Sequence, residues 1–166
     1  MPSSVQLAGT GLPVVGRHAR SVQSVLEDLI SQARREVMIA AYTIGGNLGE
    51  LLDLLQATAA RGVNLRIVLN RFYSQPGSVQ RVLLELGRKF SHVETFSYEG
   101  DGDLHMKVVV ADRRRAILGS ANLTWRGLTE NLELCVFIEG RLARIVAEIL
   151  DDVIASSKRL IMRWDT

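Results

Sequence analysis

The stretch that decides the fold is HMKVVVAD at residues 105–112, which is followed at residues 119–122 by GSAN. Its run of apolar residues predicts a buried β-strand. Because side chains alternate across a strand, His105 and Lys107 should lie side by side on one face. Asp112 has the opposite parity and falls at the turn that follows, so we expect it to play a structural role.

Further polar side chains are expected beside this pair. Ser120 and Asn122 share a parity at the end of the neighbouring strand, where Gly119 lets the backbone approach closely. An imidazole can attack phosphorus, while an ammonium, a hydroxyl and an amide can hold the non-bridging oxygens of a phosphate. On the next strand, the Glu133 carboxylate would orient the imidazole by accepting its other N–H. These residue types together predict a site for a phosphate group.

The flanking sequence predicts alternating helices and strands. Apolar residues recur at helical spacing after Ser21, which would cap the first helix. Segments that are apolar on both faces, as buried parallel strands are, alternate with the helices. The expected helices cover residues 21–34, 48–61, 76–86 and 141–158, and the expected strands cover residues 37–42, 63–69, 93–98, 104–111, 116–119 and 132–138.

The last three expected strands are joined by turns too short for helices, so they must pair antiparallel. We therefore expect an α/β fold with a mixed, mainly parallel β-sheet and helices on both faces. Residues 1–19 are expected to form an irregular arm ahead of a single domain at residues 20–166. The final helix should turn its large apolar side chains inward: Leu142, Ile145, Val146, Ile149 and Val153.

The composition is that of a globular protein whose 166 residues allow one domain: 47% are hydrophobic and 23% charged. No apolar run approaches the roughly 20 residues of a membrane-spanning helix, and the N-terminus does not resemble a signal peptide, so we expect a cytoplasmic protein. One cysteine and three histidines argue against a zinc site. The net charge of +2 permits a nucleic-acid partner without requiring one.

The spacing H-x-K-x4-D with a following G-S-x-N resembles the signature of the phospholipase D superfamily, the HKD motif. The order of helices and strands over residues 21–158 is similar to that of the superfamily's small single-motif bacterial nucleases. AYT at residues 41–43 and RGVNLRIV at residues 61–68 extend the similarity. The resemblance therefore covers nearly the whole chain.

This resemblance implies a phosphodiesterase that needs no metal or cofactor. His105 matches the nucleophile that forms a phosphohistidine, and Lys107 and Asn122 match ligands of the phosphate oxygens. Ser120 matches the hydroxyl beside them, and Glu133 matches the acid that supports the histidine. Asp112 belongs to the signature but need not contact substrate.

The superfamily mechanism uses two copies of the motif, and this chain holds one. His92 and His18 do not begin a second copy, because neither is followed by a lysine at the second position. A homodimer would bring two sites together on its two-fold axis. Its interface would need apolar side chains near the motif, for which Met106, Leu123 and Trp125 are candidates.

We expect an endonuclease that cleaves DNA or RNA without stable membrane association. Arg113, Arg114 and Arg115 are candidate contacts to the phosphate backbone, with a solvated turn as the competing interpretation. Trp125 is a candidate to stack on a base, with packing as its alternative. A lipid-cleaving phospholipase D is the alternative enzyme. The alternative from another class is a non-catalytic nucleic-acid-binding subunit of a larger complex, such as a bacterial defence system.

Overall fold

The computed structural model describes residues 3–11, 15, 19–45 and 49–160. The strands of this part are β1 (Ser4–Thr10), β2 (Arg20–Ser21), β3 (Glu36–Ala41), β4 (Ile44–Gly45), β5 (Asn64–Asn70), β6 (Val93–Tyr98), β7 (Lys107–Ala111), β8 (Arg115–Gly119), β9 (Leu123–Thr124), β10 (Glu133–Glu139) and β11 (Lys158–Arg159). The helices are α1 (Val22–Ser31), α2 (Gly49–Ala60), α3 (Gly77–Lys89), α4 (Trp125–Thr129) and α5 (Arg141–Ala155), with a 3-10 turn at Phe72–Ser74.

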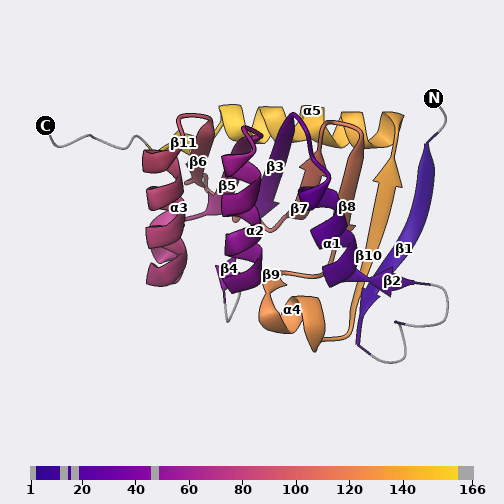
Figure 1. The fold of residues 1–166 in the computed structure, drawn as a ribbon. Coiled ribbons are helices and arrows are strands. Elements are labelled where there is room, and N and C mark those ends of the chain that lie inside the picture. The colour runs from indigo at the N-terminus through magenta and orange to yellow at the C-terminus, as the bar shows by residue number, and fades with distance from the viewer. Residues whose placement is uncertain (1–2, 12–14, 16–18, 46–48, 161–166) are drawn as a thin grey trace, which may run out of the picture.

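Nine strands form one sheet in the order β11-β6-β5-β3-β7-β8-β10-β1-β2 (Figure 1). Six of them, β1, β2, β3, β5, β6 and β8, run in one direction, and β7, β10 and β11 run in the other. The sheet is therefore mixed, which confirms the expected α/β fold class, but five of its eight strand pairs are antiparallel, so it is not mainly parallel in its pairing. β4 and β9 pair in a small separate sheet.

Helices cover both faces of the sheet, as the sequence predicts. Figure 1 shows α1, α2 and α3 side by side in front of the strands, with α5 running across them. The strand residues Val109 and Ala111 belong to the core beneath the first three helices. Val108 and Val110 belong to a second core beneath α5. This alternation in β7 is what a strand buried on both faces requires.

The predicted elements appear close to their expected bounds. The Ser21 side chain caps α1 by accepting a hydrogen bond from the Ser24 N–H at 3.1 Å. β6 spans the expected residues, whereas β7 begins at Lys107, three residues later than expected. The segment before β7 is instead held by the Asn70 side chain and by a backbone hydrogen bond from Tyr42.

The N-terminal segment departs from the expectation of an irregular arm. Residues 4–10 form β1, which pairs antiparallel with β10 over its whole length. Ala8 and Thr10 face the core, whereas Val5 and Leu7 are 58% and 47% exposed. Because the large apolar residues face solvent, their pattern does not show a strand in the sequence. Residues 12–14 and 16–18 of the expected arm lie outside the described residues.

Two expectations about apolar side chains were wrong. The first concerns α5, whose residues buried against the sheet are Ala143, Ala147, Leu150 and Ile154. Leu142, Ile145 and Ile149 are 44%, 38% and 47% exposed, because the buried face of α5 is centred one position away from the expected stripe. Val146 and Val153 pack against the core, as expected. Leu123, a candidate for the dimer interface, is 4% exposed and belongs to the core.

Candidate active site

The segment that carries His105 is fixed from both sides by hydrogen bonds. The Leu104 N–H donates to Asn70 Oδ1 at 2.9 Å, and the Tyr42 N–H donates to the Met106 carbonyl at 2.9 Å. These bonds extend the edge of β7 toward the ends of β3 and β5. The His105 side chain itself is exposed. The backbone thus presents an accessible imidazole from a fixed position.

His105 and Lys107 lie side by side, as the strand parity predicts. Lys107 Nζ is 3.1 Å from Nδ1 and 3.1 Å from Nε2 of the imidazole, and 3.0 Å from the His105 carbonyl oxygen. Partial burial lowers the pKa of Lys107, and the negative charge of Glu133 opposes that shift. An imidazole and a cation therefore share one point of the surface, with a carboxylate within electrostatic reach.

Tyr42 is a site residue that the sequence did not single out. Its ring meets the His105 ring edge to face, with centroids 4.8 Å apart and planes at 62°. Lys107 Nζ lies 5.6 Å from the centre of the same ring. Tyr42 follows the last residue of β3, and Ala41 pairs with Lys107 across the strands. The antiparallel register of β3 and β7 is the signal that would have found it.

Ser120 and Glu133 are joined to each other. The Ser120 hydroxyl donates a short hydrogen bond to the Glu133 carboxylate and accepts one from the Leu134 N–H at 3.1 Å. Asn131 Nδ2 donates to the other carboxylate oxygen at 3.2 Å. Within the described residues no hydrogen bond links Glu133 to His105. The expected support of the imidazole is therefore not present in this single chain.

Gly119 permits the close approach of β8 and β10 that the sequence predicts. A Cβ atom there would lie 2.6 Å from the Cys135 Cα and 2.6 Å from the Leu134 carbonyl oxygen. Any larger residue would push β10 away and move Glu133. Glycine at this position is therefore needed to hold Ser120 and Glu133 together.

Asn122 carries an unsatisfied polar atom. Its Oδ1 is buried and has no hydrogen-bond partner within the described residues. A buried amide left unpaired costs about 1–3 kcal/mol, so such an atom needs an explanation. An amide kept for a ligand is one such explanation, and it agrees with the role expected for Asn122.

Two buried amides, Asn70 and Gln75, position the backbone of the site, and no pattern in the sequence pointed to either. Asn70 is 6% exposed, and its Nδ2 donates to Asp103 at 3.2 Å while its Oδ1 holds Leu104. Gln75 is 8% exposed and donates to the carbonyls of Tyr42 at 3.0 Å and Asn70 at 2.6 Å. Both amides thereby connect the end of β3, next to Tyr42, with the segment before β7 that carries His105.

Asp112 has the structural role that its parity predicts. Its carboxylate accepts hydrogen bonds from the N–H groups of Arg34 (3.0 Å), Arg35 (2.7 Å) and Glu36 (3.1 Å). Partial burial raises the pKa of Asp112, but these backbone hydrogen bonds outweigh it and leave the pKa below its ordinary value. The carboxylate thus joins the β7–β8 turn to the loop before β3.

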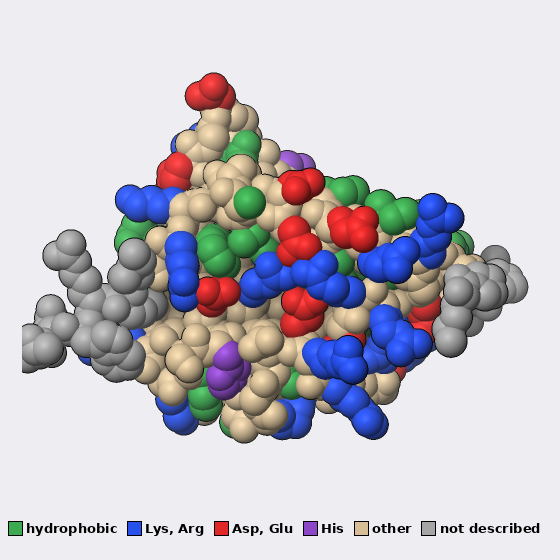
Figure 2. All heavy atoms as spheres, turned by 90° about the horizontal axis from the view of Figure 1, so that it is seen from above, with side chains coloured by type: hydrophobic (Ala, Val, Ile, Leu, Met, Phe, Trp, Pro, Cys, Tyr) green, Lys and Arg blue, Asp and Glu red, His purple; other side chains and the backbone are tan. Residues whose placement is uncertain are grey.

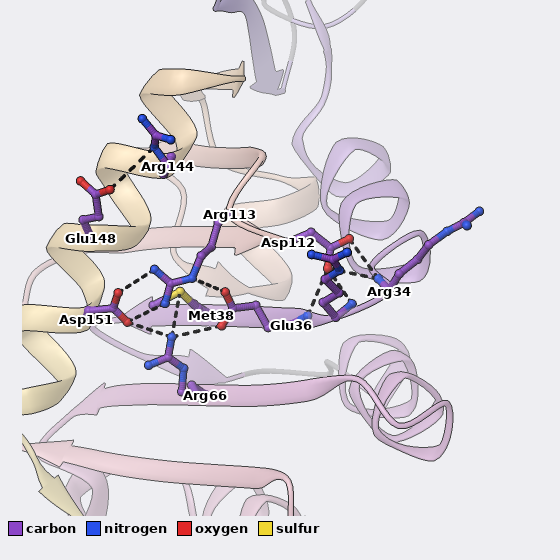
Figure 3. Close-up of polar contacts among 10 residues, drawn as sticks. Arg34, Glu36, Met38, Arg66, Asp112, Arg113, Arg144, Glu148 and Asp151 are labelled. Carbon is purple, nitrogen blue, oxygen red and sulfur yellow. Dashed lines mark hydrogen bonds and ion pairs between the residues drawn. The ribbon is translucent and has the colours of Figure 1, made fainter. Parts of the chain in front are cut away.

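The three arginines after Asp112 lie away from His105. The five extended residues of β7, with the residues that flank them, separate these arginines from the motif histidine by about 20 Å. Arg113 forms ion pairs with Asp151, at 2.7 Å, and with Glu36. Arg66 contacts the same two carboxylates (Figure 3). Hydrogen bonds from Arg113 lower the pKa of Asp151. The structure therefore does not bring these arginines to the phosphate site expected at His105.

Trp125 begins α4 close to the motif, where it borders a small hollow. Apolar side chains of α1 and α2 line this hollow, together with Glu27 and Glu50. The indole N–H donates to Glu130 at 3.1 Å, and the side chain is 40% exposed. An acidic rim is unfavourable for a phosphate backbone, so this placement favours packing over base stacking.

No group of three or more His, Cys, Asp or Glu side chains could hold a metal ion within the described residues. The helices of that part also include none that is long and apolar enough to cross a membrane. Both statements concern side chains and helices of this chain alone.

Comparison with known proteins places this geometry in a family. The family described as "Cardiolipin synthase, PLD-like domain" matches residues 26–156. The DISARM protein DrmC of Bacillus paralicheniformis is 23% identical over 93% of this chain and 65% of its own length. Phospholipase D Z of Dictyostelium discoideum is 41% identical over 68% of this chain and 30% of its own length. The human 5'-3' exonuclease PLD3 is 39% identical over 52% of this chain and 18% of its own length.

A solved structure confirms the fold. The phospholipase D family member Nuc from Salmonella typhimurium superposes with a TM-score of 0.79 at 20% identity, covering 97% of this chain and 100% of that one. The curated relatives are longer, since this chain spans less than two thirds of their length.

Proposed function

This chain belongs to the phospholipase D superfamily, through the PLD-like domain of cardiolipin synthase type, and on that premise we propose that it is a metal-independent endonuclease of DNA or RNA. The observation that carries the proposal is the exposed His105 imidazole with the Lys107 ammonium 3.1 Å away. The Glu133 charge acts on that ammonium, and Ser120 is bonded to Glu133. A nucleophile beside a cation and a hydroxyl suits a tetrahedral anion.

In the proposed reaction the neutral His105 imidazole attacks phosphorus. A nitrogen–phosphorus bond forms, the bond to the leaving oxygen breaks, and that oxygen takes a proton from a second imidazole. Water then attacks the phosphohistidine and restores His105, while the second imidazole takes a proton from the water. The Lys107 ammonium meets the charge on the non-bridging oxygens, which is the task a metal ion performs in other phosphodiesterases.

The second imidazole is proposed to come from a second copy of the chain. One imidazole cannot be unprotonated for attack and protonated for the leaving group at the same moment. Leu132 and Leu134 flank Glu133 and are 66% and 53% exposed, and Leu7 continues this apolar surface on β1. Leu134 and Leu7 point to the α5 face of the sheet, opposite the face of Glu133, so an interface that buries them would cover β1 and β10 beside the polar site. They replace Leu123 as the candidates for that interface.

A nucleic acid is proposed as substrate ahead of a lipid. The human relative is named an exonuclease, and a further cation, Arg71, follows β5 at the same edge of the sheet as His105. Its side chain is 45% exposed and is paired with an exposed Asp103 at 3.5 Å, a contact worth little in water. The name of Phospholipase D Z favours a lipid ester as the second candidate. That of DrmC favours a subunit of a defence system.

A single substrate panel tests the proposal. The protein is incubated in excess chelator with labelled single-stranded DNA, duplex DNA, RNA and phosphatidylcholine vesicles. Wild type should cleave a nucleic acid internally, and His105→Ala should lose that activity with an unchanged circular dichroism spectrum. His92→Gln is the matched control, because the His92 ring donates a hydrogen bond to the Ala59 carbonyl at 2.9 Å, away from the motif. Cleavage of the lipid alone, or equal activity of His105→Ala, would contradict the proposal.

A further inference from the structure

The edge of the sheet opposite His105 carries an open groove rich in arginine. It lies where the loop before β3, the β7–β8 turn and the first turn of α5 meet, and its volume is about 1430 Å3. Seven arginines line it: Arg34, Arg61, Arg113, Arg114, Arg115, Arg141 and Arg144. Figure 2, which looks down on this edge, shows basic side chains gathered on one side of the surface.

The charge of the groove differs in sign from that of the rest of the chain. Its lining holds two carboxylates, Asp112 and Glu139, against the seven arginines, so its formal charge is +5. The whole chain is only +2, so the other residues sum to −3. The basic residues of this protein are therefore concentrated at one site, and an even surface distribution would not produce such a field.

The two carboxylates of the groove are already engaged. Asp112 accepts the three backbone N–H groups described above, and Glu139 accepts a hydrogen bond from the Ser4 hydroxyl at 2.9 Å. Arg113 is neutralised by Glu36 and Asp151, which lie behind the groove. The acidic groups thus stabilise the walls of the groove and leave much of its positive charge uncompensated.

Four arginines of the groove have no ion pair within the described residues: Arg34, Arg61, Arg115 and Arg141. Arg34 and Arg141 are exposed, and in Figure 3 the Arg34 side chain extends away from Asp112. Arg61 and Arg115 each donate to neutral oxygens, those of Ile30 at 3.2 Å and Gln32 at 2.8 Å. Arg144 has only an exposed contact of 3.7 Å with Glu148, which is worth little.

We propose that this groove is a second binding site for a polyphosphodiester, separate from the His105 site and able to hold a nucleic-acid backbone without cleaving it. A phosphate backbone presents a charge about every 3.4 Å of duplex axis on each strand. Guanidinium groups from three chain segments are therefore better suited to successive phosphates of such a backbone than to a single small anion. Among the described residues that line the groove none is a histidine, and the site is proposed to bind a phosphate backbone without attacking it. A long nucleic acid could then contact the protein at two edges about 20 Å apart.

Binding of a fluorescent 30-nucleotide single-stranded DNA, and of the same sequence as RNA, tests the site. All proteins carry His105→Ala, so the measurement does not depend on hydrolysis or on the proposed enzymatic function. The groove variant combines Arg34→Gln, Arg141→Gln and Arg144→Gln. The matched control combines Arg81→Gln, Arg88→Gln and Lys89→Gln on α3, which removes the same charge outside the groove.

Each lost phosphate contact should reduce the slope of log K against log salt concentration by about 0.7–0.9, where K is the association constant. It should also reduce the affinity at 0.1 M salt by roughly fivefold to eightfold. The groove variant should thus lose about two units of slope, and the control should lose less than one. Equal losses in both variants, or wild-type binding by the groove variant, would overturn the proposal. So would a loss of binding to phosphatidylglycerol vesicles with nucleic-acid binding intact, since that result assigns the groove to a membrane surface. Thermal melts monitor folding of every variant.

Discussion

Replacing Asp112 by alanine should destabilise the protein without removing its chemistry. The carboxylate satisfies the N–H groups of Arg34, Arg35 and Glu36 at 3.0, 2.7 and 3.1 Å. At about 1 kcal/mol for each hydrogen bond, reduced for the exposed Arg34 and Arg35 whose N–H groups can turn to water, the loss should be about 2–3 kcal/mol. For a chain of this size that lowers Tm by roughly 5–10 °C.

The pH dependence of this loss separates a charged acceptor from simple packing. The pKa of Asp112 is lowered in the folded chain, so its stabilising effect is complete above the ordinary carboxyl pKa and disappears as pH falls through the folded value. Urea unfolding of wild type and Asp112→Ala should therefore differ by a constant amount above about pH 5 and converge in acid.

Activity measured on the folded fraction completes the test. At 20 °C, well below both transitions, Asp112→Ala should keep kcat within a few-fold of wild type because the carboxylate lies at the far end of β7 from His105. A variant of unchanged stability that had lost its activity would refute this reasoning. A stability difference that stayed constant down to pH 2 would refute the charged-acceptor part of it.

Three further predictions concern the edge of the sheet that carries His105. Activity should survive excess chelator, and loss that added magnesium restores would exclude a metal-free site. Leu134→Glu should convert a dimer to an inactive monomer in sedimentation, whereas Leu142→Glu on α5 should leave the dimer intact; the reverse result would place the interface on α5. Asn70→Ala should cost about 1–3 kcal/mol and lower kcat more than it raises KM, because Leu104 loses its anchor. Thr95→Val is its control, since the buried Thr95 hydroxyl has no partner within the described residues, and equal kinetic effects would deny Asn70 a positioning role.

The sequence predicted the central elements because their local and long-range requirements agree. Residues 37–42 are apolar on both faces, which only a strand covered on both sides explains. The same alternation correctly paired His105 with Lys107. Residues 4–10 were missed because a strand at the side of the sheet turns Val5 and Leu7 to solvent.

Features that depend on packing between distant segments were not predictable from periodicity. Asn70 and Gln75 carry no pattern of their own, and their role appears only when β3, β5 and the segment before β7 meet. Arg113 looked like a surface cation because Asp151, its partner, lies 38 residues away on α5. All three residues of this basic run therefore line the groove, and Arg113 is the one held there by ion pairs with Glu36 and Asp151.

Subunit mixing tests the shared active site most directly. Wild type and His105→Ala are unfolded together in equal amounts, refolded and assayed in chelator. If catalysis needs a histidine from each chain, only wild-type pairs are active, so activity should be about one quarter of that of the same total protein as wild type. Independent sites would give about one half, and that result, or full activity from a monomer, would contradict the account.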